Sequence, residues 1–231
     1  MADSSKDLLG QVLVDFYNGK GSALLINNKY GDPEEMPVEV FFREKEDLTD
    51  LEKAAISHCK GNILDVGAGA GAIALMLQDS FEVTAIESSE GASQVMKALE
   101  VRNGITGDVF DYAGENYDTL LLLMNGIGIV GRLDNLQKSL IHFAEMLNPD
   151  GQILLDSSDI SYLYEGEDKP ANKYFGQLTY QYAYKNQIGD WFDWLYVDFD
   201  TLSEHAEKAG LQAELLIQDE NDQYLARLTK K

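Results

Sequence analysis

From Asn62 onward, short apolar runs alternate with segments whose apolar residues recur every three or four positions. The apolar runs predict strands at 62–67 (NILDVG), 81–87 (FEVTAIE), 118–124 (DTLLLLM) and 152–156 (QILLD), with a weaker one at 107–112 (GDVFDY). Helices are predicted between them at 72–79, at 91–100, and from Asp134, as N-cap, to Leu147, where 148–151 (NPDG) ends the helix. This alternation favours a parallel sheet with helices on both faces.

The two ends of the chain follow other patterns. Alternating residues before a turn at 186–190 (NQIGD) and an aromatic run after it predict an antiparallel hairpin within 173–198. A helix over 201–210, with Gly210 as C-cap, precedes strands at 211–219 and 223–230, which are too close for a crossover and are therefore expected to be antiparallel. The N-terminal part predicts one helix, 6–17, followed by an irregular stretch.

A glycine-rich stretch, 67–71 (GAGAG), joins the first predicted strand to its helix. Such a turn lies at the carboxyl end of the sheet, where doubly wound folds bind ligands. Gly67 and Gly69 allow the backbone to lie against a cofactor, and Gly71 allows the helix to pack close to the strand. Glu87 ends the next strand, at a position where a carboxylate accepts hydrogen bonds from both hydroxyls of an adenosine ribose. The loop and the acid together predict a site for an adenosine cofactor.

Two cofactor classes fit this loop. Ala72 completes the pattern G-x-G-x-x-A, so an NAD(P)-dependent oxidoreductase is one alternative. Asp65, two residues before the first glycine, favours a cofactor with a cationic ammonium and sulfonium, because an anion is unfavourable beside a pyrophosphate. No Lys-Ser or Lys-Thr follows the glycines, which excludes a mononucleotide P-loop. A protein that binds the cofactor without turnover is a further alternative.

The segment 64–71 (LDVGAGAG) resembles motif I of the class I S-adenosylmethionine-dependent methyltransferases, and the resemblance extends from Leu51 to the C-terminus. It implies S-adenosyl-L-methionine as the cofactor and a seventh-strand hairpin at the edge of the sheet. The cofactor-binding residues that it implies are Asp65, Gly67, Ala68, Gly69, Gly71, Glu87, Ser88, Asp108, Val109 and Asn125.

The resemblance also implies a role for each of these residues. Asp65 and the glycine loop would line the methionine and ribose, and Glu87, with Ser88 beside it, would hold the ribose hydroxyls. Asp108 falls where the family places a carboxylate facing the adenine amino group, and the backbone of Val109 would approach the ring.

Asn125 and Asp159 are the candidate catalytic residues. Asn125 follows the fourth strand, where the resemblance implies a place near the transferable methyl group. It is not part of the Asn-Pro-Pro-Tyr motif of amino-directed DNA methyltransferases, which argues against a base as substrate. Asp159 belongs to 156–159 (DSSD), whose acids could orient a substrate, act as a base or help to hold a metal; capping of the loop is an equal alternative. We predict no metal site. Arg43 would reach the cofactor carboxylate or an anionic substrate, or else form a salt bridge.

The charge and the cysteine content of the chain limit its possible binding partners, its disulfides and its location. The 231 residues include 40 acidic and 18 basic ones, a formal net charge of −22, which repels nucleic acid and anionic membrane surfaces. Cys59 is the only cysteine, so no intramolecular disulfide forms; we expect it to be buried on a helix, and we expect the three histidines to be ordinary helix residues. The absence of a signal pattern and of a membrane-length apolar run predicts a cytoplasmic protein.

We therefore expect a single α/β methyltransferase domain over 1–231, built on a doubly wound, seven-stranded, mostly parallel sheet with an antiparallel last strand. Its expected parts are an N-terminal cap segment (1–46), a cofactor-binding half (47–160), a β-hairpin insertion (161–198), and a closing helix and hairpin (199–231). The cap segment and the hairpin would cover the cofactor cleft and choose an acceptor, expected to be a small molecule, whose identity and accepting atom the sequence leaves open. A dimer interface is the rival role for these segments, so the monomer and the homodimer both stay open.

Overall fold

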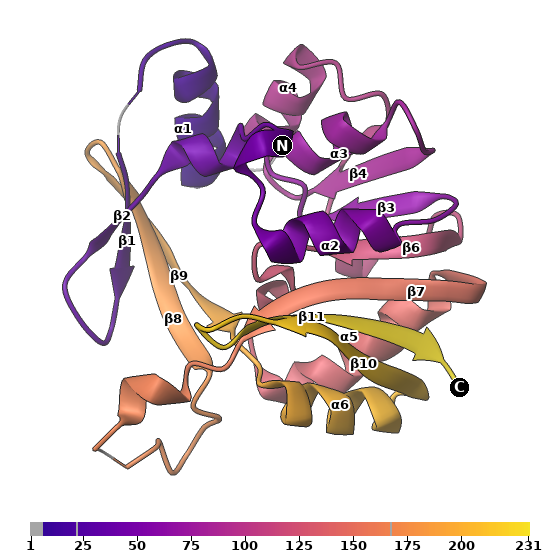
Figure 1. Ribbon diagram of the computed structural model, residues 1–231. Coiled ribbons are helices and arrows are strands. Elements are labelled where there is room, and N and C mark those ends of the chain that lie inside the picture. Colours follow the sequence, from indigo (N-terminus) through magenta and orange to yellow (C-terminus); the bar gives the residue numbers. More distant parts are fainter. Residues whose placement is uncertain (1–6, 22, 167) are drawn as a thin grey trace. The chain divides into compact units, whose positions relative to one another are not determined.

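The computed structural model describes residues 7–21, 23–166 and 168–231, and it confirms the predicted mostly parallel sheet (Figure 1). The hydrogen-bonded strand order of this sheet is β10-β11-β7-β6-β3-β4-β5. Its strands are β3 (Ile63–Val66), β4 (Val83–Glu87), β5 (Gly104–Thr106), β6 (Tyr117–Leu122), β7 (Leu147–Ser158), β10 (Leu211–Gln218) and β11 (Gln223–Lys230). β4 runs parallel to β5 and β6 parallel to β7, whereas β11 is antiparallel to both β7 and β10, as the closing pair predicts.

Six α-helices lie among the described residues, and most of them begin at a side-chain cap. They are α1 (Leu8–Tyr17), α2 (Asp50–His58), α3 (Ala72–Leu77), α4 (Glu90–Ala98), α5 (Leu133–Glu145) and α6 (Phe199–Lys208). Thr49 and Glu52 form a capping box at α2, Asp198 caps α6, and Gly210, with φ of 78°, follows its end. The prediction that Asp134 caps α5 is wrong, because Arg132 is the N-cap residue and Asp134 lies in the first turn, where an acid is still favourable.

The chain divides into two compact units. The first comprises the described residues up to Leu48, Asp65–Tyr112 and Thr179–Phe192. The second comprises Thr49–Leu64, Ala113–Leu178 and Asp193–Lys231.

A second, antiparallel sheet of order β2-β1-β8-β9 joins the N-terminal segment to the predicted hairpin (Figure 1). Its strands are β1 (Leu24–Asn28), β2 (Glu34–Met36), β8 (Gln177–Tyr184) and β9 (Gln187–Leu195). The sequence predicts an irregular stretch where β2 lies and no strand at β1, because both strands are short and β2 consists of two exposed glutamates and the half-buried Met36. They form by pairing, with Leu24 opposite Tyr184 and also opposite Met36.

Four local predictions need correction. The stretch 107–112 is no strand: β5 ends at Thr106, and Val109–Asp111 forms a short 3-10 helix, η4, in which the Asp108 side chain accepts the Phe110 amide. The hairpin turn lies at 185–186, where Lys185 has φ of 53°, so β9 already begins at Gln187. Residues 148–151 lie within β7. Cys59 follows the last residue of α2 and is half-buried, and its thiol is 3.4 Å from the Ala55 carbonyl.

The apolar face of α1 is covered inside the first unit. Leu8, Val12 and Leu13 are fully buried and pack in one cluster with Ala92 and Val95 of α4. Leu24, Val38, Ala70 and Tyr184 complete the buried cluster, which therefore joins α1 to the small sheet and to the glycine loop. In the second unit, α2 packs Leu51 and Ala55 against Leu225 of β11. No helix in the described part of the chain is long and apolar enough to cross a membrane.

Candidate functional site

The glycine loop between β3 and α3 is tied to β4 and leaves open space above its first residue. Gly67, Gly69 and Gly71 have φ of 69°, 55° and 86°, values that favour glycine, and the amide of Gly67 donates to the Ile86 carbonyl at 2.9 Å. A Cβ at Gly69 would lie 2.9 Å from the ring of Phe41, and a Cβ at Gly71 would lie 2.6 Å from Val101. At Gly67 such an atom would meet nothing within 4 Å. The two later glycines thus serve packing, and the space over Gly67 is available to a ligand.

Asp65, the third residue of β3, presents a buried oxygen without a partner in the first unit. Its side chain is 4% exposed, and its Oδ2 atom makes no hydrogen bond with any described residue. Burial, with the charge of Glu87 added, raises the pKa of Asp65 to about 7. A buried polar atom without a partner is rare in folded proteins, and it indicates a group that is missing from the protein alone. The cationic ammonium group of S-adenosylmethionine fits this oxygen.

Glu87, at the end of β4, holds the loop and keeps free acceptor capacity. It is 7% exposed; its Oε2 accepts the Gly69 amide at 2.9 Å, and its Oε1 accepts the Ser89 amide at 2.8 Å and the Ser88 hydroxyl at 3.3 Å. Burial raises the pKa of Glu87. Each carboxylate oxygen accepts two hydrogen bonds, so Oε2 has a free lone pair, and the Ser88 hydroxyl can rotate away from Oε1. The carboxylate can therefore take two hydroxyl donors.

The segment after β5 lies beside Glu87, because the Gly107 amide donates to the Glu87 carbonyl at 2.9 Å. Asp108 is exposed, and its Oδ1 accepts the Phe110 amide at 2.9 Å, which leaves Oδ2 for a ligand. The side chain of Val109 is buried. In the first unit the structure thus brings the glycine loop and Ser88 to the carboxylate of Glu87, and the segment of Asp108 and Val109 to its backbone.

Asn125 belongs to the second unit, where its amide holds backbone. With φ of 55° it precedes the short helix η5 (Gly126–Val130). Its Oδ1 accepts the Ser157 hydroxyl at 3.0 Å, and its Nδ2 donates to the Leu195 carbonyl at 3.2 Å. The Ser157 hydroxyl in turn accepts the Val197 amide at 2.9 Å. Both ends of the Asn125 amide are thus engaged, and its catalytic role stays a prediction.

The acids of the stretch 156–159 have separate roles in the second unit. Asp159 accepts the Ser161 amide at 2.8 Å, which is the geometry of the loop-capping alternative. Asp156 accepts the Asn125 amide at 2.7 Å, and burial raises its pKa to about 7. The sequence did not separate Asp156 from Asp159, although Asp156 directly follows five buried residues of β7.

Replacing Asp156 with asparagine should make stability less dependent on pH. The raised pKa means that the folded protein favours the protonated acid, so wild type loses stability as pH rises from about 4 to about 7. Asparagine keeps a carbonyl acceptor for the Asn125 amide and does not ionise. The free energy of unfolding of D156N minus that of wild type should increase by about 1 kcal/mol or more from pH 4 to pH 8. The difference between their melting temperatures should increase by about 2–4 °C over the same range. A difference in melting temperature that is the same at both pH values would contradict the prediction.

Other sequence candidates are placed without a ligand role. The Nε of Arg43 donates to the Val40 carbonyl at 2.8 Å, at the end of the short helix η2 (Val38–Phe41). His58, His142 and His205 lie on α2, α5 and α6, as predicted. Among the described residues, no group of three or more His, Cys, Asp or Glu side chains is placed to hold a metal ion.

Comparison with known proteins gives a family. Residues 64–155 match the model of a methyltransferase domain family. A structure of a SAM-dependent methyltransferase from Bacteroides fragilis, in complex with S-adenosyl-L-homocysteine, shares 40% identity over 100% of this chain and 97% of its own, with a TM-score of 0.92. No curated protein is significantly similar to the chain.

More distant structures share the fold. The CcbJ methyltransferase from Streptomyces caelestis matches with a TM-score of 0.62 and 15% identity, over 79% of this chain and 95% of its own. A S-adenosylmethionine-dependent methyltransferase from Clostridium acetobutylicum matches with a TM-score of 0.60 and 9% identity, over 80% and 94%. The glycine loop, the unpartnered Asp65 and the 40% identical relative agree with one another: the chain belongs to the S-adenosylmethionine-dependent methyltransferases, and its cofactor is S-adenosyl-L-methionine.

Proposed function

We propose that this methyltransferase acts on a small molecule and that the first unit holds the cofactor through Asp65, the glycine loop, Glu87 with Ser88, and Asp108 with Val109. The observation that carries this assignment is the unpartnered Oδ2 of Asp65, in the unit where Gly67 faces open space. In this arrangement Asp65 takes the ammonium group, Glu87 takes the ribose hydroxyls and Oδ2 of Asp108 takes the adenine amino group. The bound cofactor supplies an electrophilic methyl group on its sulfonium.

The N-terminal segment and the hairpin are proposed to enclose the acceptor. They share one sheet, in which β1 pairs with β8 over five residue pairs, and Phe41 lies against Gly69 of the cofactor loop. Methyl transfer benefits from the exclusion of water and needs an aligned acceptor, which a cover over the loop supplies. The buried face of α1 is engaged inside its own unit and is not available to a dimer. The net charge of −22 disfavours nucleic acid as the acceptor.

Asn125 and Asp159 stay the proposed catalytic residues of the second unit. Their hydrogen bonds hold backbone in this state, so their contribution would be to shape and orient rather than to accept a proton. The cytoplasmic location also stays a prediction.

Transfer of a labelled methyl group from S-adenosylmethionine to a panel of small amines, alcohols, thiols and carboxylic acids tests the proposal. We expect one chemical class to be labelled, and we expect the variant F41A to lose turnover more than cofactor affinity. Labelling of nucleic acid or protein in place of every small molecule would overturn the acceptor assignment. Binding of NAD(P) without S-adenosylhomocysteine would overturn the assignment of the cofactor residues.

A further inference from the structure

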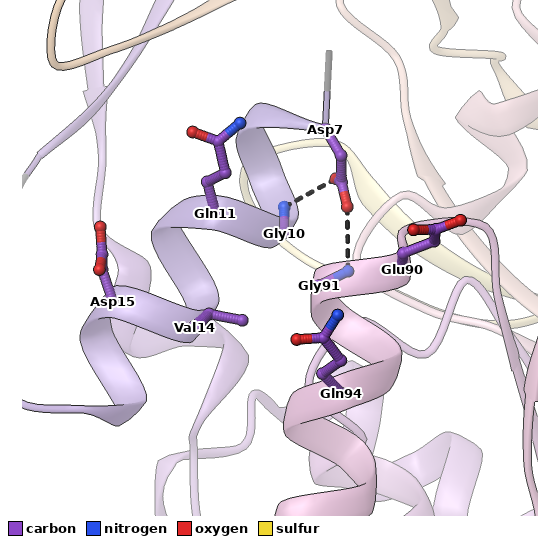
Figure 2. Close-up of a pocket in the computed structure, with 8 residues that line it drawn as sticks. All are labelled: Asp7, Gly10, Gln11, Val14, Asp15, Glu90, Gly91 and Gln94. Atoms are coloured by element: carbon purple, nitrogen blue, oxygen red, sulfur yellow. Dashed lines mark hydrogen bonds between the residues drawn. The ribbon is translucent and has the colours of Figure 1, made fainter. Parts of the chain in front are cut away.

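Asp7 joins the beginnings of two helices in the first unit. Its Oδ1 accepts the Gly10 amide at 2.9 Å and so caps α1, and its Oδ2 accepts the Gly91 amide at 3.0 Å in the first turn of α4 (Figure 2). One carboxylate thus faces the positive ends of two helix dipoles, where an anion is favoured. Residues of both helices line the pocket drawn in Figure 2.

Two glycines bring these helices into backbone contact. A Cβ at Gly91 would lie 2.5 Å from the Cα of Gly10, and a Cβ at Gly10 would lie 2.2 Å from Oδ2 of Asp7. Any side chain at either position would push the helices apart or displace the carboxylate. The position of Asp7 relative to α4 is therefore closely defined.

Ser89, the N-cap of α4, connects Asp7 to the cofactor site. Its hydroxyl donates to Oδ2 of Asp7 at 2.9 Å and accepts the Ala92 amide at 3.0 Å. Its own amide donates to Oε1 of Glu87 at 2.8 Å. A single residue thus lies between the carboxylate of Asp7 and that of Glu87.

We infer that Asp7 is a positioning residue for the cofactor: through Ser89 it holds the carboxylate of Glu87 in the orientation that accepts the ribose hydroxyls. This inference rests on the proposed role of Glu87. Without Asp7, the Ser89 hydroxyl loses its acceptor and the Gly91 amide in the first turn of α4 loses its cap. The position of Ser89 is then less well defined, and with it the amide that donates to Oε1 of Glu87.

The other end of α1 supplies a matched control. Asp15 accepts the Tyr184 hydroxyl at 2.8 Å and the Lys185 ammonium at 2.5 Å, so this acid fastens α1 to the turn between β8 and β9. D15A removes the same charge from the same helix, but Asp15 makes no contact with Ser89 or Glu87 in the hydrogen bonds of the described residues.

Calorimetric titration of the full chain with S-adenosylhomocysteine tests the inference. D7A should weaken the affinity about three- to tenfold, and D15A should leave it unchanged. D7S separates the cap from the positioning role, because serine can cap α1 but is too short to reach α4 as well; it should fold like wild type and bind as weakly as D7A. An S-adenosylhomocysteine analogue without the two ribose hydroxyls should bind D7A and wild type equally.

The outcomes distinguish the inference from the proposal under it. If E87A keeps full affinity, the ribose role of Glu87 is wrong, and the inference falls with it. If E87A binds weakly while D7A and D7S bind like D15A, only the positioning role is overturned. A loss in D7A that is as large for the analogue without hydroxyls would show general destabilisation and would also overturn it.

Discussion

Replacing Glu87 with alanine should weaken the binding of S-adenosylhomocysteine about tenfold or more. A hydrogen bond to a charged group contributes about 1.5–3 kcal/mol, and about 1.4 kcal/mol is a tenfold change in affinity. The carboxylate is 7% exposed, so little water competes for it. Titration calorimetry measures the affinity, and the melting temperature without ligand shows whether the glycine loop, which Glu87 also holds through the Gly69 amide, is still in place.

E87Q is the matched control for this change. Glutamine keeps the shape and one carbonyl oxygen, so it can still accept the Gly69 amide or the Ser89 amide, but it carries no charge. We expect its affinity to lie between those of wild type and E87A. Wild-type affinity in both variants would move the ribose contact to another residue.

The affinity for S-adenosylhomocysteine should rise about tenfold or more between pH 5.5 and pH 8, which is the second large effect. The pKa of Asp65 is raised to about 7, and only the ionised carboxylate attracts the ammonium group of the ligand. Below this pKa the fraction of protein with ionised Asp65 falls about tenfold for each pH unit, and the apparent affinity for the ligand falls with it. The burial that raises the pKa of Glu87 acts in the same direction.

The release of protons gives an independent measurement of this coupling. Near pH 6 the ligand must displace a proton from Asp65, so the binding heat should depend on the ionisation enthalpy of the buffer. D65N carries no titratable group at this position; it should bind weakly, and its affinity should vary less with pH. Equal wild-type affinity at pH 5.5 and pH 8 would show that Asp65 does not bind the ammonium group.

Short-range patterns account for what the sequence predicted well. The strand that contains Asp65, the glycines that follow and the acid that ends the next strand lie within 25 residues, and each has a local signature. The parallel core followed from runs such as 120–122, in which all residues are buried. The antiparallel closing pair followed from the short connection between β10 and β11.

Long-range pairing explains what the sequence could not predict. β1 and β2 have weak patterns of their own; β1 pairs with β8, 150 or more positions further along the chain, and β2 pairs with β1, so no local signal marks them. Beyond the local cap on Gly10, the partners of Asp7 lie 82 and 84 positions further along the chain, which hides its role. In the stretch 156–159 the pattern showed the acids but not which of them accepts the backbone amides of Asn125 and Gly126, because these residues lie about 30 positions earlier in the chain.

The pairing of β1 with β8 has a consequence for synthesis on the ribosome. Leu24 cannot pair with Tyr184 until Tyr184 has been synthesised, and at a translation rate of about 5–20 residues per second this delay is about 8–32 seconds. During this interval β1 has an open edge and the apolar face of α1 lacks part of its cover, which are features that chaperones recognise. The part of the enzyme that is made first is therefore completed among the last, and slow translation beyond the glycine loop would prolong its exposure to aggregation.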